Sequence, residues 1–198
     1  MSEEILINVT PVETRIAVVE NGMLQEIYIE RSQRRGIVGN MYKGKVVRVL
    51  PGMEAAFVDI GLDKAAFIHA SDIITADQDD SRKNGDISSL LREGQALVVQ
   101  VTKDPIGTKG ARLTTQLSVP SRYLVHMPDN GHIGISQRIE DEGERTRLRS
   151  LVENCIGESE GKASGFIVRT ASEGVGEEEL KADIVFLKRL KQSITEKI

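Results

Sequence analysis

Two phenylalanines in neighbouring apolar segments are the first residues whose chemistry needs explanation. Aromatic residues make up only 4% of the chain, and Phe57 and Phe67 each lie in a run of small apolar side chains. Successive side chains of a strand point to opposite faces, so both rings should face away from Ala56, Val58, Ile60, Ala66 and Ile68. Two exposed rings side by side form a stacking platform for nucleic-acid bases. The alternative is that a further domain covers them as core.

Basic residues flank these segments, although the net charge of the whole chain is −4. An acidic chain is not typical of nucleic-acid binding, but the distribution of charge matters more than its sum. Between positions 31 and 48 there are six basic residues and no acidic one: Arg31, Arg34, Arg35, Lys43, Lys45 and Arg48. The candidates for contacts with backbone phosphates are Lys43, Lys45, Lys103, Lys109 and Arg112. The alternative is an ordinary solvated surface.

Short strands separated by Gly and Pro must position these side chains. The pattern predicts five strands, at residues 41–50, 54–60, 65–70, 95–103 and 111–118. Five short strands with glycine-rich turns indicate a small Greek-key barrel of the OB type. The polar stretch 75–88 is expected to be a mobile loop.

The chain on either side of this barrel has a different character. Residues 5–9, 14–20 and 24–30 predict a three-stranded meander with Asn21–Gly22 as its hairpin turn, too small to form a core alone. After residue 120, strands are expected at 123–127 and 165–170. Helices are expected at 141–155 and 177–195, the second with an apolar stripe formed by Leu180, Ile184, Leu187, Leu190 and Ile194.

Several classes of protein are disfavoured by composition. The single cysteine, Cys155, allows neither a disulfide nor a cysteine-based zinc site within one chain, and its helical spacing predicts a buried small side chain. The first residues lack the basic and apolar regions of a signal peptide, and no apolar run reaches the length of a membrane span. We therefore expect a cytoplasmic protein with no membrane association.

Several motifs, in order along the chain, resemble those of the ribonuclease E/G family. The segments KGKV (43–46), AFVDIG (56–61) and AFIH (66–69) look like an S1 RNA-binding domain. The segments that narrow the resemblance are NVTPVETR (8–15), RRGIVGN (34–40), GTKGARLT (107–114), PSRYLV (120–125) and IVRTA (167–171). The resemblance covers the whole chain, and the segment 120–123 favours the G-type branch of the family.

The resemblance implies an α+β layout of three parts. Residues 1–35 resemble the start of an RNase H-like domain, here an incomplete β-meander. Residues 36–118 resemble an inserted S1 domain with an OB-type five-stranded β-barrel. Residues 119–198 resemble the family's α/β 5′-sensor domain, which reads the 5′-monophosphate of an RNA.

The resemblance also implies a phosphate site at Ser121, Val125, Arg169 and Thr170. Arg169 has the fork of donors that suits a phosphate, and Thr170 adds a hydroxyl. Ser121 and Val125 are expected to offer backbone N–H groups. Without the resemblance, residues 169–170 would predict only a strand end with a surface ion pair.

The implied parent is a single-strand-specific endoribonuclease of rRNA processing and mRNA decay that prefers 5′-monophosphorylated RNA. The family cuts with Mg²⁺ in a DNase I-like domain and forms homo-oligomers through a shared Zn²⁺, features whose motifs are missing here. Because the family's carboxylate metal site has no counterpart in this sequence, we expect this chain to be inactive, with no catalytic or metal-binding residues. The sequence also stops inside an expected helix at Lys197–Ile198 with no helix-stop signal, which indicates a piece of a longer protein. The alternative is a self-contained, non-catalytic S1 RNA-binding adaptor.

Overall fold

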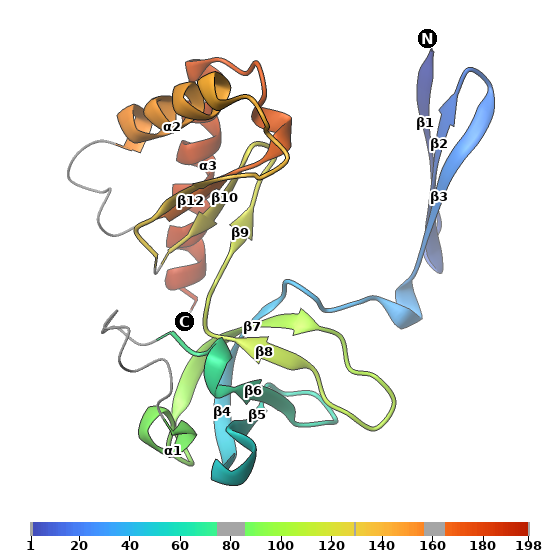
Figure 1. Ribbon diagram of the computed structural model, residues 1–198. Helices are drawn as coiled ribbons and strands as arrows, with labels where there is room; N and C mark the ends of the chain where they lie inside the picture. The colour runs from blue at the N-terminus through green and yellow to red at the C-terminus, as the bar shows by residue number, and fades with distance from the viewer. Residues whose placement is uncertain (1, 75–85, 129, 157–164, 198) are drawn as a thin grey trace. The chain divides into compact units, whose positions relative to one another are not determined.

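The computed structural model describes residues 2–74, 86–128, 130–156 and 165–197, which form two compact units (Figure 1). The first unit comprises Met1–Ile37 and the second Val38–Ile198. The finer division at residues 35 and 118 remains a prediction.

The first unit is an antiparallel meander of β1 (Glu3–Val9), β2 (Glu13–Glu20) and β3 (Met23–Arg31). Its β2–β3 turn has Asn21 at φ 49° and Gly22 at φ 79°. Positive φ at both central residues is what a two-residue type I′ hairpin requires, and Asn–Gly tolerates it best. The predicted strands and turn are confirmed.

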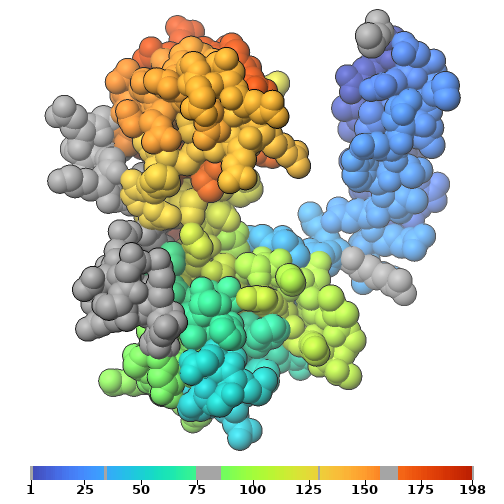
Figure 2. Space-filling view, in the orientation of Figure 1, coloured from blue at the N-terminus to red at the C-terminus, as the bar shows by residue number. Residues whose placement is uncertain are grey.

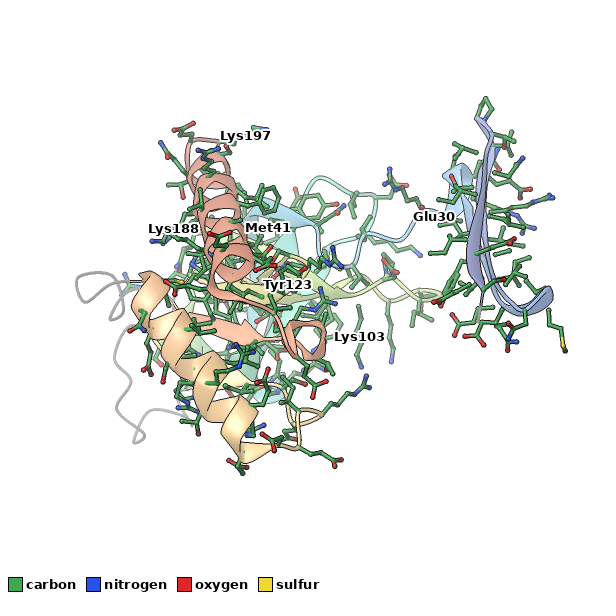
Figure 3. All side chains as sticks on the ribbon, turned by 90° about the horizontal axis from the view of Figure 1, so that it is seen from above. Glu30, Met41, Lys103, Tyr123, Lys188 and Lys197 are labelled. Carbon is green, nitrogen blue, oxygen red and sulfur yellow. The ribbon has the colours of Figure 1, made fainter. Side chains whose placement is uncertain are left out.

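No described side chain of this meander is buried. Ile5, Leu6 and Ile7 alternate across the two faces, yet each remains more than half exposed, at 62%, 56% and 64%. Side chains project from both sides of the ribbon, and no second layer of the same unit covers them (Figure 3). As expected, three strands without a covering layer make no core.

The second unit begins with the predicted closed barrel, in the order β4-β5-β6-β8-β7. Its strands are β4 (Met41–Leu50), β5 (Ala55–Asp59), β6 (Ala66–His69), β7 (Ala96–Lys103) and β8 (Arg112–Thr114). All neighbours are antiparallel except β6 and β8. The core of this barrel includes Val46, Ala56, Val58, Ala66, Ile68, Val99, Val101 and Leu113.

The expectation of a loop over residues 75–88 is wrong at its end. Helix α1 (Ile87–Leu90) begins there, with the Asp86 side chain accepting a hydrogen bond from Ser88 N at 3.0 Å. Ile87 is completely buried, and its N–H donates to the Glu54 carboxylate at 3.1 Å. An N-cap and one buried anchor stabilise a helix too short for periodicity to reveal. Residues 75–85 lie outside the described residues.

The rest of the second unit is an α/β region with a sheet of order β11-β12-β10-β9. Its strands are β9 (Val119–Pro120), β10 (Leu124–Met127), β11 (Ile133–Ile135) and β12 (Gly165–Val168). Helices α2 (Glu142–Ile156) and α3 (Glu177–Thr195) contact each other and pack on this sheet (Figure 1). Both predicted helices are confirmed, with Leu180, Ile184 and Leu187 buried and Cys155 partly buried against the same core. Sequence patterns missed β9 and β11, which are too short to show alternation.

A histidine lies unpaired inside this core. His126 of β10 is 1% exposed and stacks on Phe166 with ring centroids 4.8 Å apart. Neither ring nitrogen has a hydrogen-bond partner among the described residues. Burial lowers the pKa of His126 to about 4, and the nearby positive charges of Lys191 and Lys188 act in the same direction. The folded state therefore holds a neutral imidazole.

This histidine predicts an acid-sensitive fold. The unfolded chain takes up a proton near the ordinary histidine pKa of about 6.5, whereas folded His126 resists it down to about 4. The free energy of unfolding should be unaffected by His126 above about pH 6.5. It should fall by the order of 3 kcal/mol between there and about pH 4.

Urea unfolding across this pH range measures the loss. The variant His126→Phe, which keeps an aromatic ring against Phe166, should flatten the dependence. His132→Phe, at an exposed histidine, should leave it unchanged. An equal dependence in native protein and His126→Phe would contradict this account.

Candidate nucleic-acid interface

The two phenylalanines meet on the outer surface of the barrel. Phe57 of β5 and Phe67 of β6 are register partners in an antiparallel pair. Phe57 is 37% exposed and Phe67 is half-buried, whereas Ala56 and Val58 are buried inside. The predicted alternation is confirmed, and the two rings lie side by side as a base-stacking platform requires.

Register extends this pair into a row that crosses all five strands, which we call the outer row. Arg48 aligns with Phe57, Phe67 aligns with Arg112, and Arg112 aligns with Lys103. The outer row therefore has two aromatic rings in its middle and cations on both sides. Arg48 was not among the predicted site residues, because its contact with the row depends on a register shift in β4 between Val46 and Arg48.

A pocket of about 610 Å³ opens beside the two rings. It is lined by Leu50, Met53, Ala55, Ala56, Phe57, Lys64, Ala65, Phe67, Thr108, Lys109 and Gly110. Apolar side chains dominate, and Lys64 and Lys109 supply positive charge. An unstacked base and its phosphates would find complementary surfaces here.

A close approach of two backbone segments shapes this pocket. A Cβ on Gly110 would lie 1.9 Å from the Ala65 carbonyl oxygen, so only glycine lets the turn reach the start of β6. Lys64 Nζ donates to the Gly107 carbonyl at 2.5 Å and fastens the same turn. Lys64 was missed in the sequence because it lies in a turn, where no periodic pattern marks its direction.

The other predicted cations are less uniform in their surroundings. Lys109 lines the pocket, but Lys43 and Lys45 of β4 are not among its lining residues. Arg112 is half-buried and forms an ion pair with Asp72, with Nη2 and Nε at 2.8 and 2.9 Å from Oδ2. Its charge is therefore already partly balanced by the protein.

The α/β region brings Arg169 and Ser121 into direct contact. Arg169 follows the end of β12, and its Nη1 donates to the Ser121 carbonyl. The Arg169 backbone N–H donates to the Tyr123 carbonyl at 2.9 Å. Among the described residues Arg169 forms no ion pair, so this part of the chain does not show the surface ion pair that residues 169–170 alone would predict.

The remaining predicted phosphate-site residues have different surroundings. Thr170 begins a 3-10 turn, with its hydroxyl 3.3 Å from that of Ser136. Val125 lies in β10, aligned with Pro120 and Ile167. The Ser121 N–H donates to the Leu124 carbonyl at 2.8 Å. It is not free for a phosphate, contrary to expectation, because the 121–124 turn closes on itself.

Asp183 of α3 lies near this site and was not among the residues predicted from the sequence. Its Oδ2 accepts from Ser121 Oγ, from Tyr123 N at 3.2 Å and from Leu124 N at 3.0 Å. The sequence does contain a signal for a buried role, because Asp183 lies between Leu180 and Leu187 on the apolar stripe of the helix. An acidic residue on such a stripe needs hydrogen-bond donors.

The described residues offer no metal ligand set and no membrane span. None of the His, Cys, Asp and Glu side chains in residues 2–74, 86–128, 130–156 and 165–197 form a group of three or more that could hold a metal ion. None of the helices in the described ranges has the length and apolar character needed to cross a membrane.

Comparison with known proteins agrees with this architecture. Residues 37–114 match the S1 RNA binding domain, and residues 118–198 match the Ribonuclease E/G family. The chain is 59% identical to Ribonuclease G of Haemophilus influenzae over 98% of its own length and 40% of that relative. It is 58% identical to Ribonuclease G of Escherichia coli K12 over 100% of its length and 41% of the relative. It is 38% identical to Ribonuclease E of Buchnera aphidicola over 92% of its length and 19% of the relative.

The exposure of Phe57 predicts separable effects on RNA binding and stability. Phe57→Ala should weaken binding of a single-stranded RNA by about 1–3 kcal/mol, because a stacked base loses its platform. Its stability loss should be smaller than the roughly 3–5 kcal/mol expected for Phe166→Ala, whose ring is completely buried.

Fluorescence anisotropy with a labelled oligonucleotide and thermal melting give the two readouts. Tyr28→Ala, which removes an exposed ring from the meander, is the matched control and should bind as the native chain does. If Phe57→Ala binds RNA with normal affinity but its melting temperature collapses, the Phe57 ring belongs to the core and not to an RNA interface.

Proposed function

Because the chain belongs to the ribonuclease E/G family, we propose that it is the RNA-recognition part of a single-strand-specific endoribonuclease. The observation that carries this proposal is the Phe57–Phe67 pair beside a pocket with Lys64 and Lys109. Stacking on exposed rings needs unpaired bases, which favours single-stranded over duplex RNA. The self-contained adaptor has less support, since relatives named as ribonucleases match along nearly the whole chain.

We further propose that the α/β region binds the 5′-monophosphate of the RNA. Arg169 supplies a planar cation for charge-assisted hydrogen bonds to the phosphate, and Thr170 supplies a hydroxyl. The Ser121 carbonyl orients the guanidinium through the contact with Nη1. Val125 lies on β10, the strand that follows the 121–124 turn, and completes the proposed site.

Cleavage belongs, in this proposal, to parts of the enzyme beyond the present chain. The chain spans about two fifths of the length of its ribonuclease G relatives. We assign the catalytic Mg²⁺ and the inter-subunit Zn²⁺ of a homo-oligomer to those other parts. The parent enzyme would act in the cytoplasm, in rRNA processing and mRNA decay.

The proposed phosphate site makes a prediction about differences between two RNAs. In the native chain an RNA with a 5′-phosphate should bind more tightly than the same RNA with a 5′-hydroxyl. Arg169→Ala should remove that preference, at a cost of about 1.5–3 kcal/mol for the phosphorylated RNA alone.

Lys109→Ala is the matched control, because it removes a cation from the barrel pocket. It should weaken both RNAs alike and reduce the salt dependence of binding. Affinities at one fixed salt concentration give the preference, and affinities over a series of salt concentrations give the salt dependence. If Arg169→Ala loses equal affinity for both RNAs, Arg169 is part of the general basic surface and does not read the 5′-phosphate.

The assignment of cleavage predicts that this chain alone is inactive. Purified protein incubated with a 5′-monophosphorylated single strand and Mg²⁺ should leave the RNA intact on a denaturing gel. The reason is that the proposed cleavage site lies in another part of the enzyme. Specific metal-dependent cutting that a point substitution within residues 1–198 abolishes would refute the assignment.

A further inference from the structure

The position of Arg169 is determined by the carbonyl groups of one short turn, residues 121–124. The Ser121 carbonyl accepts from the Arg169 guanidinium, and the Tyr123 carbonyl accepts from the Arg169 N–H at 2.9 Å. The Tyr123 carbonyl also accepts from Ser172 Oγ at 2.8 Å. Any movement of this turn would therefore move the guanidinium that the proposed function assigns to the phosphate.

A single carboxylate holds the other side of the turn. Tyr123 N, Leu124 N and the Ser121 hydroxyl all converge on Asp183 Oδ2. Hydrogen bonds to a charged acceptor are stronger than neutral ones, and three of them on one oxygen fix the turn in place. Tyr123 lies beside α3 in Figure 3, which agrees with these contacts.

The helix that carries Asp183 is itself fixed by the core. Leu180, Ile184 and Leu187 are at most 1% exposed, and Asp183 lies on the same side of α3, half-buried. A rigid helix therefore transmits its position to the turn through one side chain. In the described part of the chain Asp183 and Arg169 form no ion pair, so the carboxylate does not neutralise the guanidinium.

We propose that Asp183 is the positioning residue of the terminal-phosphate site. By holding the 121–124 turn it places the Ser121 carbonyl where that group orients Arg169. Without the carboxylate, the Tyr123 N–H loses its acceptor and the Leu124 N–H keeps only a longer contact, 3.4 Å, with Ser121 Oγ. The guanidinium then loses its fixed orientation. Selection of the 5′-phosphate then weakens while the barrel still binds the body of the RNA. This inference rests on the proposed function of Arg169.

A simpler role for Asp183 would act by charge alone. A carboxylate near the site repels a phosphate, so its removal would raise the affinity for 5′-phosphorylated RNA. Positioning predicts the opposite sign. It also predicts that Asp183→Asn, which keeps an oxygen acceptor for the turn, retains function that Asp183→Ala loses.

The test measures phosphate preference, defined as the ratio of the Kd for 5′-hydroxyl RNA to that for 5′-monophosphate RNA. The proteins are the native chain, Asp183→Ala, Asp183→Asn, Arg169→Ala and the control Glu153→Ala. Glu153 is exposed on α2, so its substitution changes net charge equally. Asp183→Ala should lower the preference about tenfold or to unity, Asp183→Asn should keep it within about twofold, and Glu153→Ala should leave it unchanged.

Amide hydrogen exchange gives a second readout that does not depend on RNA. The Tyr123 and Leu124 amides should exchange faster in Asp183→Ala, with the core amides of β12 unchanged. If Asp183→Ala does not fold, Asp183→Asn decides the matter, because a charge-only role requires its preference to change from the native value.

The outcomes separate this inference from the proposed function. A native preference that Arg169→Ala abolishes but Asp183→Ala retains overturns the positioning role alone. Higher phosphate preference in Asp183→Ala, or equal weakening of both RNAs, also overturns it. No preference in the native chain overturns the proposed phosphate site, and the role of Asp183 with it.

Discussion

Closure of the five-stranded barrel fixes which side chains of β5 and β6 meet solvent. Ala56, Val58 and Ile68 fill the interior of the barrel. Because successive side chains of a strand point to opposite faces, Phe57 and Phe67 then lie on the outer surface. Antiparallel register then aligns the two rings with each other. The candidate interface is therefore a consequence of how the core is packed, and its two rings are already aligned without a ligand.

The same principle operates in the α/β region with hydrogen bonds in place of apolar packing. Core residues hold α3 against the sheet, and Asp183 carries that rigidity to the 121–124 turn. The carbonyl groups of the 121–124 turn then hold Arg169. An exposed arginine would otherwise lose much rotamer freedom on binding a phosphate, and preorganisation reduces this cost.

Sequence patterns revealed those features that depend on local periodicity. The alternation around Phe57 predicted both the strand and the outward ring, and Asn21–Gly22 predicted a hairpin that forms with both residues at positive φ. Lys64 and Asp183 were missed because their roles depend on partners 43 and about 60 positions away. The family resemblance implied that the Ser121 N–H binds phosphate, but this N–H donates to the Leu124 carbonyl within its own turn. No local sequence pattern reveals that hydrogen bond.

Under the proposed function, preformed surfaces of the barrel and of the α/β region bind the same RNA. Backbone amide chemical shifts, recorded while the protein is titrated with a short single-stranded RNA, report which residues bind it. We expect shifts around Phe57, Phe67 and Lys109 with either 5′ end, and additional shifts at residues 169–172 only with a 5′-phosphate. Shifts confined to the meander, or identical shifts at 169–172 for both RNAs, would contradict this proposal.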